Sequence, residues 1–346
     1  MLFRSNWAFE QDISGWDVSK VITAQGMFKG CENFNQDIGR WNVSSMIIMS
    51  RMFQDCKRFN QDIGNWYMTN KGNLYQMFYN TPFDNGGSDS INGWNVSNMV
   101  TMYQTFESTP FNRNIGSWNV SQVQNMDSMF KNASLFNQNL GNWNVSNVLY
   151  ANNMLDNCGM SQKNYDNLIV GWSNLTLQNG VTFGVNGLLY SDTPCLAYFR
   201  RDYIITNFGW TFVGDSTGIC IPFSSLWVTT SPNETITLPY VLNGNYLGII
   251  NWGDGNIVSN TIGNTTHTYV NPGTYQIDIT GIIEGWDFQT YSTSKDNIIE
   301  ILNWGSLKGL NGSNQGMFYN CSNLVLTGVT DTPRSEEHTS ELQSQF

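Results

Sequence analysis

A tryptophan that returns about every 25 residues is the strongest regularity in the apolar positions. It stands at Trp16, Trp41, Trp66, Trp94, Trp118 and Trp143. Each copy reads close to W-N-V-S-x-V-x-x-M-x-x-M-F-x-x-x-x-x-F-N-Q-x-I-G-x. Self-similarity at a fixed period indicates a tandem array, because one such unit is too short to bury its own apolar face. We therefore expect successive copies to stack on one another.

Within one copy, the spacing of the apolar residues predicts a short helix and then a short strand. Met46, Met49, Met52 and Phe53 recur at the spacing of one helical face. The segment from 59 to 63 then alternates apolar and polar residues, as a strand does. The pattern predicts an α/β repeat solenoid of the leucine-rich-repeat type, with a parallel sheet and short helices, followed by a small all-β sandwich.

The domain boundaries are expected where this pattern changes. The array covers residues 1–172 and begins inside a copy, so we expect the true amino terminus, with a signal peptide, to lie upstream. Residues 173–222 lose the period and are expected to cap the array. Residues 223–293 predict the sandwich, and residues 294–333 start a second array. Residues 334–346 turn abruptly polar and resemble a translated sequencing adapter, so we interpret them as an artefact.

Composition and charge narrow the function. The chain has 16 Lys and Arg against 27 Asp and Glu, a net charge of −11, which argues against nucleic acid as a partner. Two histidines, His267 and His338, leave little from which to build a zinc site or a catalytic triad. No apolar run is long enough for a membrane span in this fragment. We expect no catalytic residue and no enzyme.

The alternation in F-N-Q-x-I points the Phe and Ile inward and predicts an exposed polar stripe for binding. Its members are Glu10, Asp12, Asn35, Asp37, Asn60, Asp62, Asn112, Asn114, Asn137 and Asn139. Strands lie about 4.8 Å apart, so Asp12, Asp37 and Asp62 would form a column of like charges. The column is either solvated or occupied by a low-affinity Ca²⁺ ion, and no other cofactor is expected.

The amide and thiol side chains support two further hypotheses. Four glutamines share the inward register and predict a hydrogen-bonded ladder along the stack: Gln11, Gln36, Gln61 and Gln138. Cys195 and Cys220 either pair across the cap or remain separate, and the spacing leaves both alternatives open.

The units W-N-V-S-x-V-x-x-M-x-x-M-F and F-N-Q-x-I resemble the BspA-like leucine-rich-repeat surface proteins over residues 1–222. The W-G-D-G of residues 252–255, with H-T-Y at 267–269 and P-G-T-Y at 272–275, is similar to PKD-type sandwiches. The resemblance implies an extracellular or cell-surface adhesion protein that binds a protein or glycan partner through its repeat face, with the sandwich as a spacer. The alternative is the targeting or accessory region of a secreted polysaccharide-acting enzyme whose catalytic domain is missing from this fragment.

Overall fold

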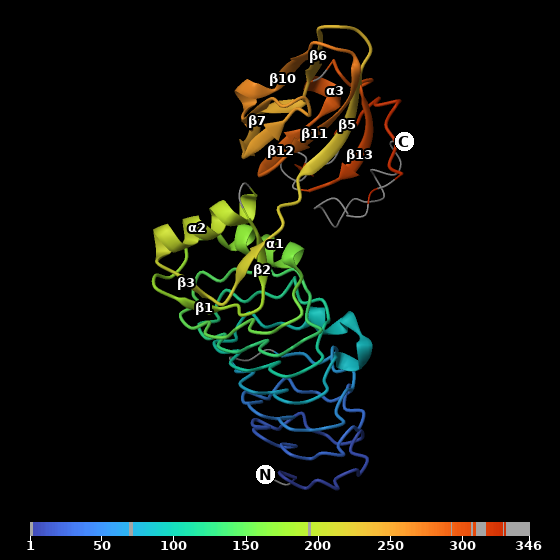
Figure 1. Cartoon of the computed structure of the whole chain (residues 1–346). Helices are drawn as coiled ribbons and strands as arrows, with labels where there is room; N and C mark the ends of the chain where they lie inside the picture. The colour runs from blue at the N-terminus through green and yellow to red at the C-terminus, as the bar shows by residue number, and fades with distance from the viewer. Residues whose placement is uncertain are drawn as a thin grey trace. The chain divides into compact units, whose positions relative to one another are not determined.

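A computed structural model of the chain describes residues 3–68, 72–192, 195–291, 293–305, 307–308, 316–327 and 329. The contacts divide the chain into two compact units (Figure 1). The amino-terminal unit comprises Met1–Tyr190 and Arg200–Gly218, and the carboxy-terminal unit comprises Ser191–Phe199 and Ile219–Phe346. No helix in the described ranges is long and apolar enough to cross a bilayer. The segment interpreted as an adapter, residues 334–346, lies outside them.

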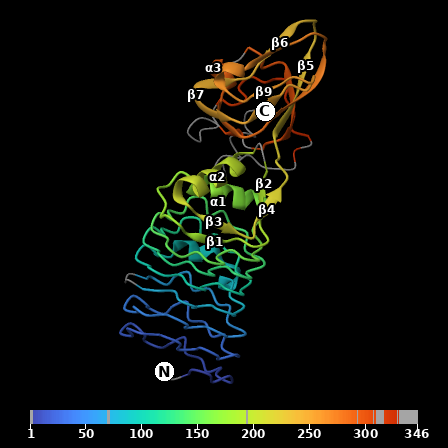
Figure 2. The ribbon, with the colours of Figure 1, turned by 60° about the vertical axis from the view of Figure 1, so that its left-hand side comes forward.

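In the amino-terminal unit, successive repeats lie above one another as turns of the chain (Figures 1 and 2). Main-chain groups at the same repeat position join one turn to the next. Phe28 N–H donates to the Met52 carbonyl at 3.0 Å, and Phe53 N–H donates to the Met77 carbonyl at 3.0 Å. These bonds form only isolated parallel bridges between repeats, such as Thr101 with Asn125. The repeats are therefore joined by backbone hydrogen bonds without forming a regular sheet.

The predicted fold class is wrong. The described residues before 162 contain no β-strand and no α-helix, and only two short 3-10 segments, Asn85–Gly87 and Asp89–Gly93. The regular strands lie elsewhere, in small sheets that are mostly antiparallel, so neither the parallel sheet nor the short helices of a leucine-rich-repeat solenoid are present. The apolar spacing of three belongs to single turns, in which Met52 N–H donates to the Met49 carbonyl at 3.2 Å.

Left-handed residues explain why these turns do not continue into helices. Two positions in each repeat, four residues apart, have positive φ: Gly26 and Gly30, Arg51 and Asp55, Gln76 and Asn80, Gln104 and Ser108, Ser128 and Asn132, and Asn153 and Asn157. A left-handed residue cannot lie within a right-handed helix without interrupting it. The chain therefore changes direction on both sides of each Met-Phe pair, and the side chains of that pair point into the core.

The tryptophan rows form the interior, as their period predicted. From Trp41 to Trp143 these side chains are buried. Each indole N–H also donates to a carbonyl of the preceding repeat, for example from Trp118 to Ile91 at 3.0 Å and from Trp143 to Ile115 at 3.0 Å. Each tryptophan therefore buries a large apolar ring and also bonds two repeats together.

The carboxyl end of this unit contains its regular secondary structure. The elements are α1 (Gln162–Trp172), β1 (Thr182–Gly184), β2 (Leu189–Ser191), α2 (Leu196–Phe208), β3 (Thr211–Val213) and β4 (Ser216–Gly218). β1 pairs with β3 in parallel, and β2 pairs with β4. The Ser161 side chain accepts the Asn164 N–H and caps α1.

The carboxy-terminal unit is built from short strands. These are β5 (Phe223–Thr229), β6 (Glu234–Thr237), β7 (Tyr240–Leu247), β8 (Ile249–Asn251), β9 (Ile257–Ser259), β10 (Thr266–Tyr269), β11 (Gly273–Ile279), β12 (Ile282–Trp286), β13 (Ile298–Asn303) and β14 (Leu307–Lys308), with the 3-10 segment Ile262–Asn264 and α3 (Phe288–Tyr291). One sheet has the order β13-β5-β11-β8-β9, a second has β14-β12-β7, and β10 pairs with β6. All resolved pairings here are antiparallel except β12 with β14.

The buried core of this unit extends past residue 293, where the sandwich was expected to end. The Gly-Asp-Gly signal closes the β8–β9 hairpin, where Gly253 and Gly255 have φ of 84° and 95°. Met317, Phe318 and Cys321, from the segment expected to start a second array, lie in the same buried cluster as Trp227 and Trp286. Cys195 and Cys220 form a disulfide with their Cα atoms 5.5 Å apart, which decides the alternative that the spacing left open.

Candidate binding face

The asparagines of the predicted stripe join the repeats to one another. The Asn35 side-chain oxygen accepts the Asn60 N–H at 3.0 Å, and the Asn112 oxygen accepts the Asn137 N–H at 2.9 Å. The Asn137 oxygen accepts the Ser161 N–H at 2.8 Å. These residues lie at the surface, but their oxygens already have backbone donors. The first column of the stripe is therefore a structural ladder.

The second column caps turns. Asp12, Asp37, Asp62, Asn114 and Asn139 each accept the backbone N–H two residues further on, at 2.9–3.0 Å. This is the geometry of an Asx turn, and it favours Asp and Asn at these corners. The N–H and hydroxyl of Ser14 hold the pKa of Asp12 below its usual value. Glu10, the remaining member of the stripe, is exposed, and its carbonyl accepts the Gln36 amide at 2.7 Å.

The three aspartates of the proposed calcium column lie on successive turns. In the described part of the chain, no group of three or more His, Cys, Asp or Glu side chains is placed to hold a metal ion. Asp62 is further engaged by the Ser90 hydroxyl at 2.7 Å. The calcium site stays a prediction, while the structure gives these carboxylates a role in capping turns.

The predicted glutamine ladder is wrong. Gln61 Nε2 donates to the Asn35 carbonyl at 3.1 Å, and Gln138 Nε2 donates to the Asn112 carbonyl at 3.1 Å. These glutamines are partly exposed and bond to the asparagine ladder, not to one another. Without a regular strand, the assumed inward register does not apply to them.

An insertion explains the longer spacing between Trp66 and Trp94. The loop at 84–93 bulges from the repeats where Figure 1 shows the two short 3-10 segments. Asp84 takes the ladder position, accepts the Asn112 N–H at 2.8 Å, and forms a salt bridge with Arg113 at 2.9 Å. Arg113 replaces the glutamine of the other repeats, so this exchange preserves the contact between turns.

A row of exposed apolar side chains lies on the side of the repeats that carries the isolated bridges. Its members, with their exposed fractions, are Ile22 (62%), Ile47 (43%), Ile48 (37%), Val100 (44%), Leu149 (44%) and Tyr150 (53%). We call these six residues the aliphatic face. Sequence reasoning missed them, although in four repeats an apolar residue recurs five positions before the pair Met27-Phe28 or its equivalents, Met52-Phe53, Thr105-Phe106 and Met154-Leu155. The other two repeats carry Gly72 and Gln124 there.

On one side, the aliphatic face is flanked by uncharged side chains in most repeats. We compared the residues two positions before Ile22 and before the equivalent residue of the other repeats. Four of them are uncharged: Ser45, Asn98, Gln122 and Asn147. The first repeat has Lys20 there. Apolar side chains surrounded by uncharged polar groups are typical of the centre of a protein interface, where charged residues are depleted. This face is therefore the best candidate for a contact surface.

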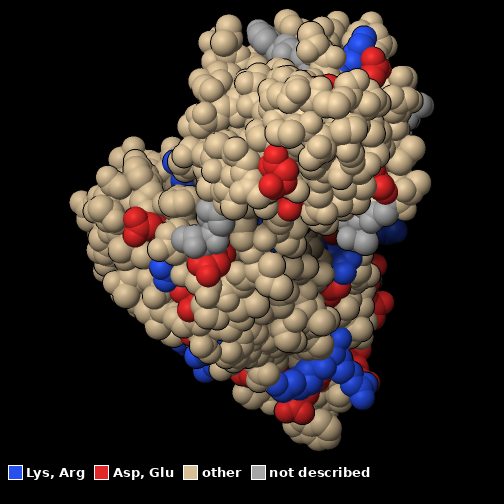
Figure 3. Space-filling model, turned by 45° about the horizontal axis from the view of Figure 1, so that its top comes forward, with Lys and Arg blue, Asp and Glu red and all other residues tan. Residues whose placement is uncertain are grey.

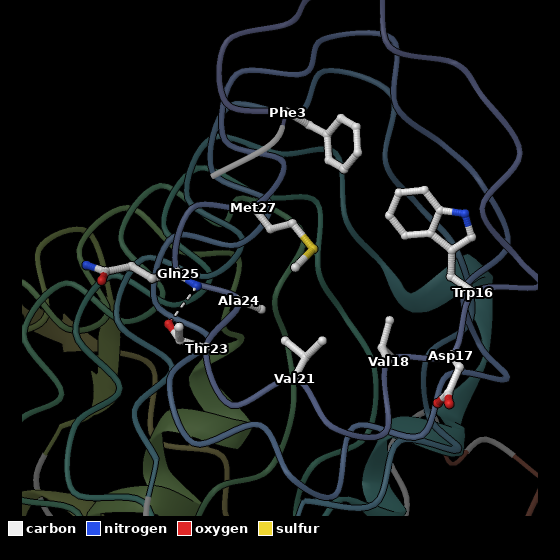
Figure 4. A pocket seen from close by; sticks show the side chains of 9 residues that line it. All are labelled: Phe3, Trp16, Asp17, Val18, Val21, Thr23, Ala24, Gln25 and Met27. Carbon is white, nitrogen blue, oxygen red and sulfur yellow. Dashed lines mark hydrogen bonds between the residues drawn. The ribbon is translucent and has the colours of Figure 1, made fainter.

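An apolar cavity of about 400 Å³ lies against the first repeat (Figure 4). Phe3, Trp16, Val18, Val21 and Met27 line it. In later repeats the equivalent side chains are buried within the repeat core. The cavity thus has mainly the lining of a repeat interior, with Asp17, Thr23 and Gln25 as its polar members.

In the carboxy-terminal unit, His267 Nε2 lies 2.7 Å from an Asp254 carboxylate oxygen. The imidazole stacks on Trp252 with the ring centroids 5.1 Å apart and meets Tyr269 edge-on at 4.6 Å. Burial opposes ionisation of Asp254, but hydrogen bonds from His267 and the Asn256 N–H hold its pKa below the usual value. These contacts hold the β8–β9 hairpin against β10, so His267 has a structural role.

The geometry defines a protein of stacked repeats with an exposed aliphatic face. Residues 1–90 and 81–172 match the family described as "Mycoplasma protein of unknown function, DUF285", which is associated with BspA-like surface repeat proteins. No curated protein and no solved structure matches the chain.

Proposed function

We propose that this is a non-enzymatic cell-surface binding or adhesion protein whose repeats bind an extracellular protein or glycan. The observation that carries the proposal is the aliphatic face. Apolar side chains recur at one solvent-exposed position, although the fold does not need them there, since Gly72 and Gln124 replace them in other repeats. Fully burying an exposed side chain of this size contributes about 1.5–3 kcal/mol. These side chains are 37–62% exposed, so each would contribute roughly half of that, and several together supply the apolar contact for a specific partner.

The cysteines support an extracellular location. The Cys195–Cys220 disulfide is typical of oxidising compartments. Burial raises the pKa of the Cys31 thiol to about 11 and that of Cys56 well above its ordinary value. Such buried thiols are unreactive and would survive an oxidising environment unchanged. We assign the carboxy-terminal unit a spacer role, and we base its PKD-like identity on the W-G-D-G, H-T-Y and P-G-T-Y motifs.

The test compares the full chain with a variant of the aliphatic face on an array of extracellular matrix proteins and glycans. Ile47→Gln, Val100→Gln and Leu149→Gln each introduce the residue that another repeat carries at this position as Gln124, so the fold should be retained. The matched control is Leu135→Gln, because Leu135 is 59% exposed but lies outside the face. We expect the triple variant to lose the partner and the control to keep it. Equal retention of both would refute the role of the face.

A further inference from the structure

The aliphatic face belongs to two neighbouring columns of residues that follow the stack of repeats. Main-chain bonds join the turns along the first column, as from Leu149 N–H to the Gln124 carbonyl at 2.8 Å. Isolated parallel bridges align the second column, as between Asn125 and Tyr150. From turn to turn, the first column is Ile22, Ile47, Gly72, Val100, Gln124 and Leu149, and the second is Thr23, Ile48, Asn73, Thr101, Asn125 and Tyr150.

The two columns carry the same kinds of residue in either direction from the turn of Val100. One turn away they carry small or amide side chains, which are Gly72 and Asn73 on one side and Gln124 and Asn125 on the other. Two turns away they carry large apolar side chains, which are Ile47 and Ile48 on one side and Leu149 and Tyr150 on the other. Such a surface is complementary to a copy of itself that runs in the opposite direction, as a twofold interface requires.

We infer that the aliphatic face binds the same face of a second copy of this chain, with the two stacks antiparallel and a twofold axis at Val100. The inference rests on the proposed binding function and names the partner. In this arrangement Ile47 meets Leu149 of the second copy, and Val100 meets its own equivalent, so apolar side chains are buried against apolar side chains. The carboxamides of Asn73 and Asn125 also face each other, and each carries a donor and an acceptor for the other.

The charges next to the columns suit this arrangement. From the second to the sixth turn, the residues two positions after the second column are Ser50, Tyr75, Tyr103, Asp127 and Asn152. The twofold axis sets Asp127 opposite Tyr75 of the second copy. The Arg51 guanidinium lies 5.1 Å from the Tyr75 ring centroid, so the carboxylate meets a cation rather than another anion. One Asp127 oxygen already accepts the Asn152 N–H at 2.6 Å, so the match is one of charge.

The dimensions of the face predict a weak dimer. Bridged turns lie about 4.8 Å apart and residues along a turn about 3.3 Å apart, so the face covers roughly 24 Å by 10 Å, or roughly 240 Å². A stable interface buries about 800 Å² on each partner. We therefore expect a dissociation constant on the order of 100 µM.

A weak antiparallel pair suits adhesion between opposed surfaces, because many copies on each surface form such contacts at once. Each copy has a net charge of −11, and Figure 3 shows groups of charged side chains separated by broad uncharged surface. Salt screens the repulsion between two such copies and does not weaken an apolar contact. Added salt should therefore tighten the dimer.

Charge exchange across the twofold axis tests the antiparallel register. When Ile47→Lys in one copy is mixed with Leu149→Glu in another, the two new charges are opposite and lie together. Each variant alone sets its new charge against an aliphatic side chain. The matched control mixes Ile47→Lys with Ile47→Glu, whose new charges the antiparallel register keeps about four turns apart. Both positions are exposed, so melting curves of the variants should match that of the parent chain.

Sedimentation velocity of the full chain, over about 10–1,000 µM, measures the association. We expect a dimer of the parent chain, weakened at least about tenfold by Ile47→Lys or by Leu149→Glu alone and restored when these two variants are mixed. Leu135→Gln should dimerise like the parent. A parent chain that stays monomeric at about 1 mM, a mixture no tighter than its components, or equal recovery in the control mixture would overturn the inference.

The same samples separate this inference from the proposed function. A parent chain that stays monomeric but is retained on the array of matrix proteins and glycans would overturn the twofold dimer and leave the proposed function in place. A dimer that charge exchange restores, with no retention on the array, would support the second copy as the partner and exclude the arrayed ligands.

Discussion

A buried charge network at the end of the amino-terminal unit provides the sharpest test of this structure. Both Asp215 carboxylate oxygens accept hydrogen bonds from Arg201, each at 2.8 Å, and one also accepts the Tyr165 hydroxyl at 2.8 Å. The Asp215 side chain is 1% exposed and that of Arg201 is 19% exposed. The guanidinium also lies 4.7 Å from each of the Tyr190 and Phe212 ring centroids. The Asp215 carboxylate thus holds Arg201 where it contacts side chains from α1, β2 and β3.

Asp215→Asn should be strongly destabilising, because it leaves the Arg201 charge half-buried without its counterion. Burial alone would lower the pKa of Arg201, but the hydrogen bonds and charge of Asp215 raise it above its usual value, so the arginine stays charged. Removing one partner of such a pair costs about 3–5 kcal/mol. In a unit of about 200 residues, where 1 kcal/mol moves the midpoint by about 2–4 °C, the expected loss is about 6–20 °C.

Thermal and urea unfolding, followed by tryptophan fluorescence, measure this loss. Asp202→Asn is the control, because Asp202 is exposed on the same helix as Arg201. Arg201→Met and the double variant complete a thermodynamic cycle, and the double variant should recover part of the stability, since it removes both charges. A change below about 1 kcal/mol for Asp215→Asn, or strict additivity in the cycle, would refute the reasoning.

Three further predictions use the same unfolding assays. Trp118→Phe keeps most of the ring but loses the indole bond to the Ile91 carbonyl, so we expect a loss of about 1–2 kcal/mol in urea unfolding, and an unchanged midpoint would contradict the tryptophan ladder. Gly253→Ala should lower the melting temperature by more than an ordinary surface change, because φ is +84° and the new Cβ would lie 2.4 Å from a backbone oxygen; a neutral effect would argue against this hairpin geometry. The pKa of Asp254 is depressed in the folded state, so the stabilisation from its bond with His267 is present above the usual carboxyl pKa. That stabilisation is lost as pH falls through the folded-state pKa. Urea midpoints measured from pH 6 to pH 3 should therefore fall less in Asp254→Asn than in the parent chain.

The period and its apolar members follow from sequence alone. A tryptophan every 25 residues has to be buried somewhere, and only a neighbouring copy of the same repeat is always available to cover it. For that reason the stacking of repeats and the burial of Trp41, Met52 and Phe53 were predictable without coordinates. The β8–β9 hairpin was predictable for a similar local reason, because glycine allows the positive φ that its turn requires.

The tertiary structure decided which polar residues were available and which apolar ones were not buried. Apolar spacing cannot distinguish a helix from separate turns that each place one Met inward, so the left-handed residues at Arg51 and Asp55 gave no signal in the pattern. Asn35 and Asp37 looked like a binding stripe, but the hydrogen bonds that they accept come from backbone groups whose positions only the fold defines. Ile47, by contrast, is an apolar residue that the fold leaves 43% exposed. Sequence sets each residue's chemistry, whereas exposure and hydrogen-bond partners depend on backbone dihedrals and on contacts 25 residues away, which only the tertiary structure fixes.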